Sequence, residues 1–356
     1  PSPLNLETLE GAALAASPSY LWLATPSAVW RASRSDEAVD LGDDVLSVET
    51  EDGPEGGRLR MTLRNDHGRF AEGSAPIGEG REVELRVGYR TSAGEETVRW
   101  QRYQVDGWRF ESAPGRATVT VTAADGWALL AGWRARRQFA WPAGSASVFE
   151  ILAALLARAG PRLVASGASP TLGILRPAFT VNPGADARSA VRALLAMTPD
   201  ALRFDGAEAV VTELSASEDP SYEYGPGHPW RSLSTGGDAP DANRVRVTGD
   251  GVSAEAYDWA SVEASGDRLA HIEDRNLTDG AGAVARAEAA LRRLVLERDA
   301  GEAVAPANVG QELYDVVRFV DPAAGVDVTR RVRGLGLRFR RGANARFELA
   351  LRLGPV

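Results

Sequence analysis

Alternating apolar and polar residues predict a run of short strands in the first third of the chain. Over 82–89, Val83, Leu85 and Val87 alternate with charged residues, which is the period-two pattern of a half-buried strand. The same reasoning predicts further strands in five segments: 45–50, 58–63, 97–104, 107–112 and 117–123. Short strands at this spacing favour an antiparallel barrel or sandwich.

A helix is predicted after this block, beginning at Ser147. Ser147 and Glu150 have the spacing of a capping box, in which each side chain bonds to the backbone of the other. Phe149, Leu152 and Leu156 recur at helical spacing, so the helix has one apolar face. A Gly-Pro pair ends it.

Three further features precede the last block. A second helix is predicted over 185–197. The segment 202–212 is predicted as a two-stranded hairpin that turns at Asp205 and Gly206. Residues 216–242 are rich in Ser, Asp, Gly and Pro, and this composition predicts a loop or linker.

The last block returns to alternation at 243–248, and one alanine-rich helix over 280–298 interrupts it. The chain therefore reads as strands, then helices, then strands. This order predicts an α+β fold class that is rich in strands.

Size and composition are those of a globular protein with two or three domains: 356 residues, 44% hydrophobic and 25% charged. No window is long and apolar enough to predict a membrane-spanning segment. The chain starts without Met or a secretory signal, which fits a fragment or a processed product with an upstream domain.

Charge and cysteine content narrow the function classes. Without cysteine the chain forms no disulfide or thiolate metal site. Without lysine, all 40 basic residues are arginine, which we interpret as a coding bias. A net charge of −9 argues against a general nucleic-acid-binding surface, which is normally basic.

The histidines do not predict a metal or proton-transfer site. His67 lies in a turn, His228 in a Pro- and Gly-rich loop and His271 in a surface segment, with no ligand spacing between any two. We therefore predict no metal.

The carboxylates give no clear catalytic pair. Most lie in turns, such as Asp52, or on exposed faces, and Glu82 and Glu84 are predicted on the solvated face of one strand. Neither a nucleophile elbow nor a nucleotide-binding loop is present. We predict no catalytic residue and no cofactor.

Residues 65–68, Asn-Asp-His-Gly, end a predicted strand. Asn65 and Asp66 are of the types that bond to turn backbone, and Gly68 adopts a positive φ at low cost. We predict a structural turn formed by Asn65, Asp66 and Gly68, with no catalytic role for His67.

Aromatic and basic clusters are candidates for interfaces. Of nine tryptophans, five lie in the first block and its exit, where a core or interface role is favoured over sugar or base stacking. Six arginines in two runs are candidate interface residues that pair with carboxylates of a neighbouring subunit, although a solvated face explains them equally well. They are Arg134, Arg136, Arg137, Arg330, Arg331 and Arg333.

Several motifs together resemble the phage tail baseplate hub, or tail-tip hub, family over 39–356. The turn at 65–68 with the strand after it is similar to that family's first barrel, and Asn-Arg-Val-Arg-Val-Thr-Gly at 243–249 to the start of its second. The helix at 280–298 and the final strands have counterparts there too.

This resemblance implies two tail-tube-like antiparallel β-barrels, at 39–135 and 243–356. A small α/β domain at 136–215 and the linker 216–242 would lie between them. Residues 1–38 have no counterpart, so their role is unknown and they fit part of an upstream domain.

The resemblance also implies a structural virion protein. Three copies would form a homotrimer whose six barrels join the sixfold tail tube to the threefold tip or spike. Its partners would be the tail tube protein, distal tail proteins, and spike or tape-measure proteins. DNA would pass transiently without specific binding, for which an acidic protein is suited. The expected location is the phage tail tip in the virion, after assembly in the host cytoplasm.

Two alternatives remain open from the residues. One is a tail-associated cell-wall hydrolase with carboxylates as acid and base. The other is a carbohydrate-binding receptor module that uses exposed tryptophans.

Overall fold

The computed structural model describes nine segments of the chain, which form two compact units. The described residues are 27–31, 38–70, 78, 81–92, 94–206, 208–236, 240–275, 277–342 and 345–356. Unit 1 comprises 1–126, 220–234 and 302–352, and unit 2 comprises 127–219, 235–301 and 353–356. Both units draw on segments that are far apart in the sequence.

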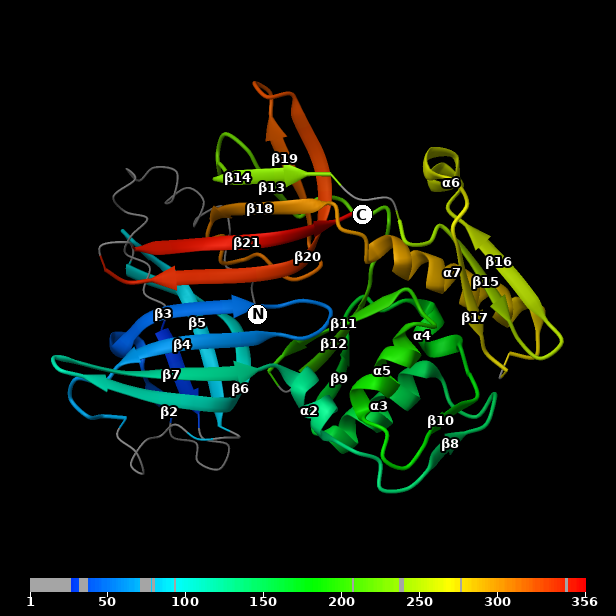
Figure 1. The fold of residues 1–356 in the computed structure, drawn as a ribbon, viewed down its shortest axis with the longest axis horizontal. Coiled ribbons are helices and arrows are strands. Elements are labelled where there is room, and N and C mark those ends of the chain that lie inside the picture. Colours follow the sequence, from blue (N-terminus) through cyan, green and yellow to red (C-terminus); the bar gives the residue numbers. More distant parts are fainter. Residues whose placement is uncertain are drawn as a thin grey trace. The chain divides into compact units, whose positions relative to one another are not determined.

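Unit 1 is built around one 13-stranded sheet (Figure 1). Its elements are β1 (Ser27–Arg31), β2 (Ala38–Asp40), the 3-10 helix η2 (Gly42–Asp44), β3 (Val45–Glu51), β4 (Arg58–Arg64), β5 (Glu82–Thr91), β6 (Gly94–Ala113), β7 (Arg116–Ala124), β13 (Tyr222–Tyr224), β14 (Ser232–Thr235), β18 (Gly301–Pro306), β19 (Val316–Asp321), β20 (Val326–Arg340) and β21 (Arg346–Gly354). The main path runs β14-β18-β21-β20-β3-β4-β7-β6-β5-β1-β2.

The strand β20 joins the late strands of this sheet to the early ones. Its first part pairs antiparallel with β19, where Val326 lies opposite Asp321. Its last part pairs antiparallel with β3, where Arg338 lies opposite Glu49. Strands from the first and the last block of the sequence therefore share one sheet.

Alternation along these strands separates a core face from a polar face. On β4, Leu59, Met61 and Leu63 are at most 2% exposed, while Arg58 and Arg60 are exposed. The period-two pattern in the sequence thus produces the observed burial.

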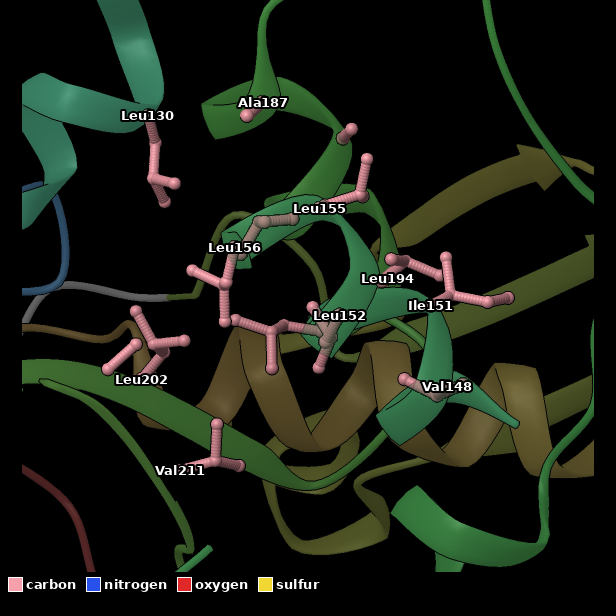
Figure 2. Close-up of a cluster of buried hydrophobic side chains, with 14 of the residues drawn as sticks. Leu130, Val148, Ile151, Leu152, Leu155, Leu156, Ala187, Leu194, Leu202 and Val211 are labelled. Carbon is pink, nitrogen blue, oxygen red and sulfur yellow. The ribbon is translucent and has the colours of Figure 1, made fainter. Parts of the chain in front are cut away.

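Unit 2 contains a helical core. Its elements before residue 219 are α2 (Gly126–Gly132), β8 (Phe139–Trp141), α3 (Val148–Ala159), β9 (Arg162–Ala165), α4 (Pro170–Ile174), β10 (Phe179–Val181), α5 (Ala187–Leu195), β11 (Asp200–Asp205) and β12 (Glu208–Glu213). Figure 2 shows leucines of α3 and α5 packed with Leu202 of β11 and Val211 of β12. The two predicted helices and the hairpin at Asp205 are observed.

The capping box at the start of α3 forms as predicted. The Glu150 N–H donates to Ser147 Oγ at 3.2 Å, and the Ser147 N–H donates to Glu150 Oε2 at 2.7 Å. Two backbone donors at the helix start are thereby satisfied.

The remaining part of unit 2 holds a second, smaller layer. A three-stranded sheet in the order β16-β15-β17 packs against α7 (Gly280–Leu296). The other elements are β15 (Arg244–Thr248), β16 (Ser253–Tyr257), α6 (Trp259–Ser265) and β17 (Leu269–Glu273).

Residues of the expected second barrel, 243–356, are therefore divided between two sheets. Val245 and Val247 of β15 pack against Ala287 and Ala290 of α7, so a helix covers the apolar face of this strand. The strands after residue 301 instead join the sheet of unit 1.

The expected N-terminal segment, 1–38, lies mostly outside the described residues, and so does its apolar run at 20–24. Residues 27–31 form β1, which pairs antiparallel with β5 and β2. None of the helices in the described part of the chain is long and apolar enough to span a membrane.

The predicted fold class is confirmed. The fold is α+β and rich in strands, and the large sheet of unit 1 is mostly antiparallel.

Candidate assembly site

The point where β3 meets β20 is held by a buried carboxyl group. The Asp52 N–H donates to the Leu335 carbonyl at 2.9 Å, and the Leu335 N–H donates to the Asp52 carbonyl at 2.8 Å. From β6, the Tyr103 hydroxyl donates to both carboxylate oxygens of Asp52 at 3.0 Å. Asp52 therefore ties together strands that come from both ends of the sequence.

The environment of Asp52 favours its neutral form. Burial of the carboxyl raises its pKa to about 8, and the charge of Asp125 adds to this effect, whereas the Tyr103 hydrogen bond opposes it. Gly57 leaves room for the group, since a Cβ there would lie 2.3 Å from Asp52 Oδ1. The sequence predicted that Asp52 lies in a turn, but its side chain is buried beside β3, β6 and β20.

A second buried carboxylate lies on β5. Glu84 is 2% exposed, and its oxygens lie 2.8 Å from Arg86 Nε and 2.8 Å from Arg102 Nη2. Burial alone would raise the pKa of Glu84, but these two arginines outweigh it and lower the pKa. The prediction that Glu84 lies on a solvated face was wrong, because its two arginine partners allow this carboxylate to be buried. Glu82, on the same strand, is half-buried.

The predicted turn at 65–68 has well-defined contacts. Asn65 is buried, and its Oδ1 accepts from the Phe70 N–H at 2.8 Å. Asp66 Oδ1 accepts from the Ala117 N–H at 3.1 Å, which ties the turn to β7. Gly68 has a φ of 69°.

The first run of candidate arginines lies in unit 2. Arg134 forms an ion pair with Asp186 at 2.8 Å while its side chain stays 58% exposed. Arg136 and Arg137 are exposed, and the Arg137 guanidinium lies 5.4 Å from the centre of the Phe139 ring. All three lie at the surface of this unit.

The second run lies on β20 and includes one correction. Arg330 and Arg333 are half-buried, but Arg331 is 1% exposed and donates from Nη1 to the Tyr314 carbonyl at 2.8 Å. Because its side chain points into the unit, Arg331 does not lie at a surface. The basic run gave no signal for this, because burial does not alternate at this point of β20, where Arg331 and its neighbour Val332 are both buried.

The three histidines have different surroundings. His67 is exposed, and His271 Nε2 lies 2.9 Å from Thr248 Oγ1. His228 bonds to Tyr222, and burial lowers its pKa. Among the described residues, no group of three or more metal-ligating side chains is present.

The tryptophans of the first block and its exit mostly pack in cores. Trp127 is 3% exposed, and Trp133 and Trp141 pack against the core of unit 2. Trp108 is different, because its side chain on β6 is 38% exposed.

The sheet of unit 1 ends in short strands. β2 and β14 stand at the two ends of its path and contain three and four residues. Edge strands present backbone groups that can pair with another chain.

Comparisons with known proteins bear on this arrangement. Neither protein-family models nor curated proteins match the sequence. The 43 kDa tail protein of prophage MuSo2 from Shewanella oneidensis is 14% identical, with a TM-score of 0.63 over 92% of this chain and 98% of that one. The tail protein from Neisseria meningitidis MC58 is 12% identical, with a TM-score of 0.68 over 92% and 96%. The chain has the fold of phage tail proteins.

A component of a secretion system also has a structure similar to that of this chain. The E. coli c3393 protein, a type VI secretion component described as similar to T4 tail proteins gp27 and gp5, is 14% identical with a TM-score of 0.55. The match covers 92% of this chain and 76% of c3393. The predicted resemblance to tail hub proteins is confirmed for the fold.

Proposed function

We propose that the chain is a non-enzymatic structural subunit of a phage tail hub or tip. In this role, three copies form a ring that joins the sixfold tail tube to the threefold tip or spike. DNA passes through the ring without specific binding.

The observation that carries this proposal is the pairing of β20 with β3. It joins strands of the first and last sequence blocks in one sheet within unit 1. A ring of three such subunits would present six related groups of strands. It could therefore contact the sixfold tail tube on one side and the threefold tip or spike on the other.

The sheet ends supply a physical means of assembly. β2 and β14 are short, so each offers only a few backbone groups to another copy. Additional side-chain contacts would then have to fix the register of the subunits. Arg134, Arg136, Arg137, Arg330 and Arg333 remain candidates for pairing with carboxylates of a neighbour.

The proposed partners follow from this position in a tail. They are the tail tube protein, distal tail proteins, and spike or tape-measure proteins. The chain would assemble in the host cytoplasm and remain in the virion at the tail tip. The turn at Asn65, Asp66 and Gly68 would serve folding alone.

The buried carboxylates support a structural role over a hydrolytic one. Asp52 and Asp125 are close enough for their charges to interact, but they are 8% and 6% exposed. Their burial separates them from any large glycan.

Cryo-electron microscopy of the tailed particle tests the proposal. We expect density for three copies at the end of the tail tube nearest the host. Density along the tube or at the head, or cell-wall hydrolysis that a single Asp or Glu substitution abolishes, would contradict it.

A further inference from the structure

A groove crosses the polar face of the sheet in unit 1. Two hollows, of about 890 Å³ and 590 Å³, share Glu49, Arg338 and Arg346 in their linings and are therefore continuous. Their lining residues come mainly from β18, β21, β20, β3, β4, β7 and β6. These strands follow one another in the sheet (Figure 1). We call this surface the arginine groove.

The lining of the arginine groove has a net positive charge, whereas the chain as a whole has a net negative charge. Eight arginines and four carboxylates line it, although the whole chain carries a net charge of −9. Among these arginines, Arg58, Arg60 and Arg338 are exposed. Within the described residues these three form no ion pair, so their charges are available to a ligand.

The register places two of these arginines, Arg60 and Arg338, in one row with Glu49 across the strands. Arg338 of β20 lies opposite Glu49 of β3, and Glu49 lies opposite Arg60 of β4. Because side chains of directly opposed residues lie about 5 Å apart, two arginines flank one carboxylate in the middle of the groove.

The groove lacks the features of a protein-binding site. Among the described residues that line it, Phe339 is the one aromatic residue and is 7% exposed. Leu59, Leu335 and Leu351 are at most 5% exposed, and Leu46 and Val304 are half-buried. Protein interfaces centre on apolar and aromatic anchors and are depleted of charge, whereas nucleic-acid interfaces are strongly positive. A polyanion with charge along its length therefore fits better than a polypeptide.

We propose that the arginine groove binds the phosphate backbone of DNA. The ligand depends on the proposed role in a tail, which brings DNA past the chain. With no exposed aromatic side chain to stack on a base, the groove contacts phosphates and does not read sequence.

The carboxylates in the groove limit the strength of this contact. Glu49 is exposed between Arg338 and Arg60, so a phosphate near either arginine also meets a like charge. This combination gives a surface that holds DNA weakly and releases it, as a conduit requires. It also explains how an arginine-rich surface avoids trapping the polyanion.

The test uses the full chain and a fluorescein-labelled duplex DNA of about 30 base pairs, with binding followed by fluorescence anisotropy over a salt series. We expect a dissociation constant of about 10⁻⁵ M that rises steeply with salt. The double variant Arg60→Ala/Arg338→Ala should weaken binding about tenfold or more and lower the salt slope by about two. The variant Glu49→Gln should tighten binding.

The matched control is Arg162→Ala/Arg275→Ala, which removes the same charge from exposed positions outside the groove. It should leave binding unchanged. The proposal is overturned if the wild-type chain does not bind DNA at low salt, or if both double variants bind alike. Binding of poly-L-glutamate in place of DNA would also overturn it and indicate an acidic polypeptide.

Light scattering on the same samples separates this inference from the proposed function. A trimer that does not bind DNA contradicts the groove alone. A monomer that binds DNA through Arg60 and Arg338 supports the groove and contradicts the ring.

Discussion

The Tyr103 hydroxyl donates to both carboxylate oxygens of Asp52, each at 3.0 Å. Both side chains are buried, and the backbone of Asp52 pairs with Leu335 of β20. A polar contact therefore lies where the early and late strands of the sheet meet. Because buried polar groups are costly to leave unsatisfied, this contact favours one arrangement of β3, β6 and β20.

Replacing Asp52 should change how stability depends on pH. Its pKa is raised from 3.8 to about 8, so between these values the folded chain binds more protons at this group than the unfolded chain does. This contribution to stability is therefore full below about pH 4 and is lost as the pH rises through about 8. Asp52→Asn should gain stability relative to the wild type as the pH rises, and this gain should amount to about 4 kcal/mol between pH 5 and pH 9.

Urea unfolding at the two pH values checks this, with Asp219→Asn as a control at an exposed aspartate. The control should follow the wild type at both. If Asp52→Asn loses stability equally at pH 5 and pH 9, the carboxyl is not held neutral in the folded chain.

Gly68 should tolerate substitution poorly because of its backbone conformation. An added Cβ would meet nothing within 4 Å, so its φ of 69° alone makes a side chain costly. Gly68→Val should lose about 1–2 kcal/mol in thermal unfolding, and Gly68→Asn less, because Asn adopts this region more readily. His67→Gln should change little, since His67 is exposed.

The same variants separate folding from function at this turn. Loss of infectivity in His67→Gln particles that are fully assembled would contradict a purely structural turn.

Asn243 should stabilise the small sheet of unit 2. It is fully buried, its Nδ2 donates to the Gly266 carbonyl at 2.8 Å, and its Oδ1 accepts from the Arg268 N–H at 2.8 Å. Asn243→Ala leaves both groups unpaired and should cost about 2 kcal/mol in chemical unfolding. Asn182→Ala, which removes an exposed hydrogen bond to Gln138, should cost less than about 0.5 kcal/mol. Equal losses for the two variants would exclude this role.

Replacing Arg331 should destabilise the fold more than replacing its neighbour Arg330. Arg331→Ala creates a cavity and leaves the Tyr314 carbonyl without this donor, so we expect a loss of about 3 kcal/mol in unfolding free energy. Arg330→Ala should cost less than about 1 kcal/mol because its side chain is half-buried. If the Arg331→Ala variant is as stable as the wild type, Arg331 has no structural role and is again a candidate interface residue.

Features set by neighbouring residues could be predicted from the sequence. The capping box of Ser147 and Glu150 spans four residues, and the hairpin at Asp205 needs only a short turn between two apolar runs. The motifs that predicted a tail-hub fold were likewise local patterns in a recognisable order. Each depends on spacing that the sequence displays directly.

Features set by distant residues could not be predicted. The pairing of β20 with β3 joins segments almost 300 residues apart, and no local pattern specifies it. Asp52 was assigned to a turn because it precedes Gly53 and Pro54, while its burial depends on Tyr103 and Leu335. The helix α7 likewise covers β15 from about 40 residues away.

The mass of the chain in solution tests the central claim most directly. Size-exclusion chromatography with light scattering, run over a range of protein concentrations, should give three times the 37.9 kDa of one chain. A well-behaved monomer at every concentration would contradict the proposed ring.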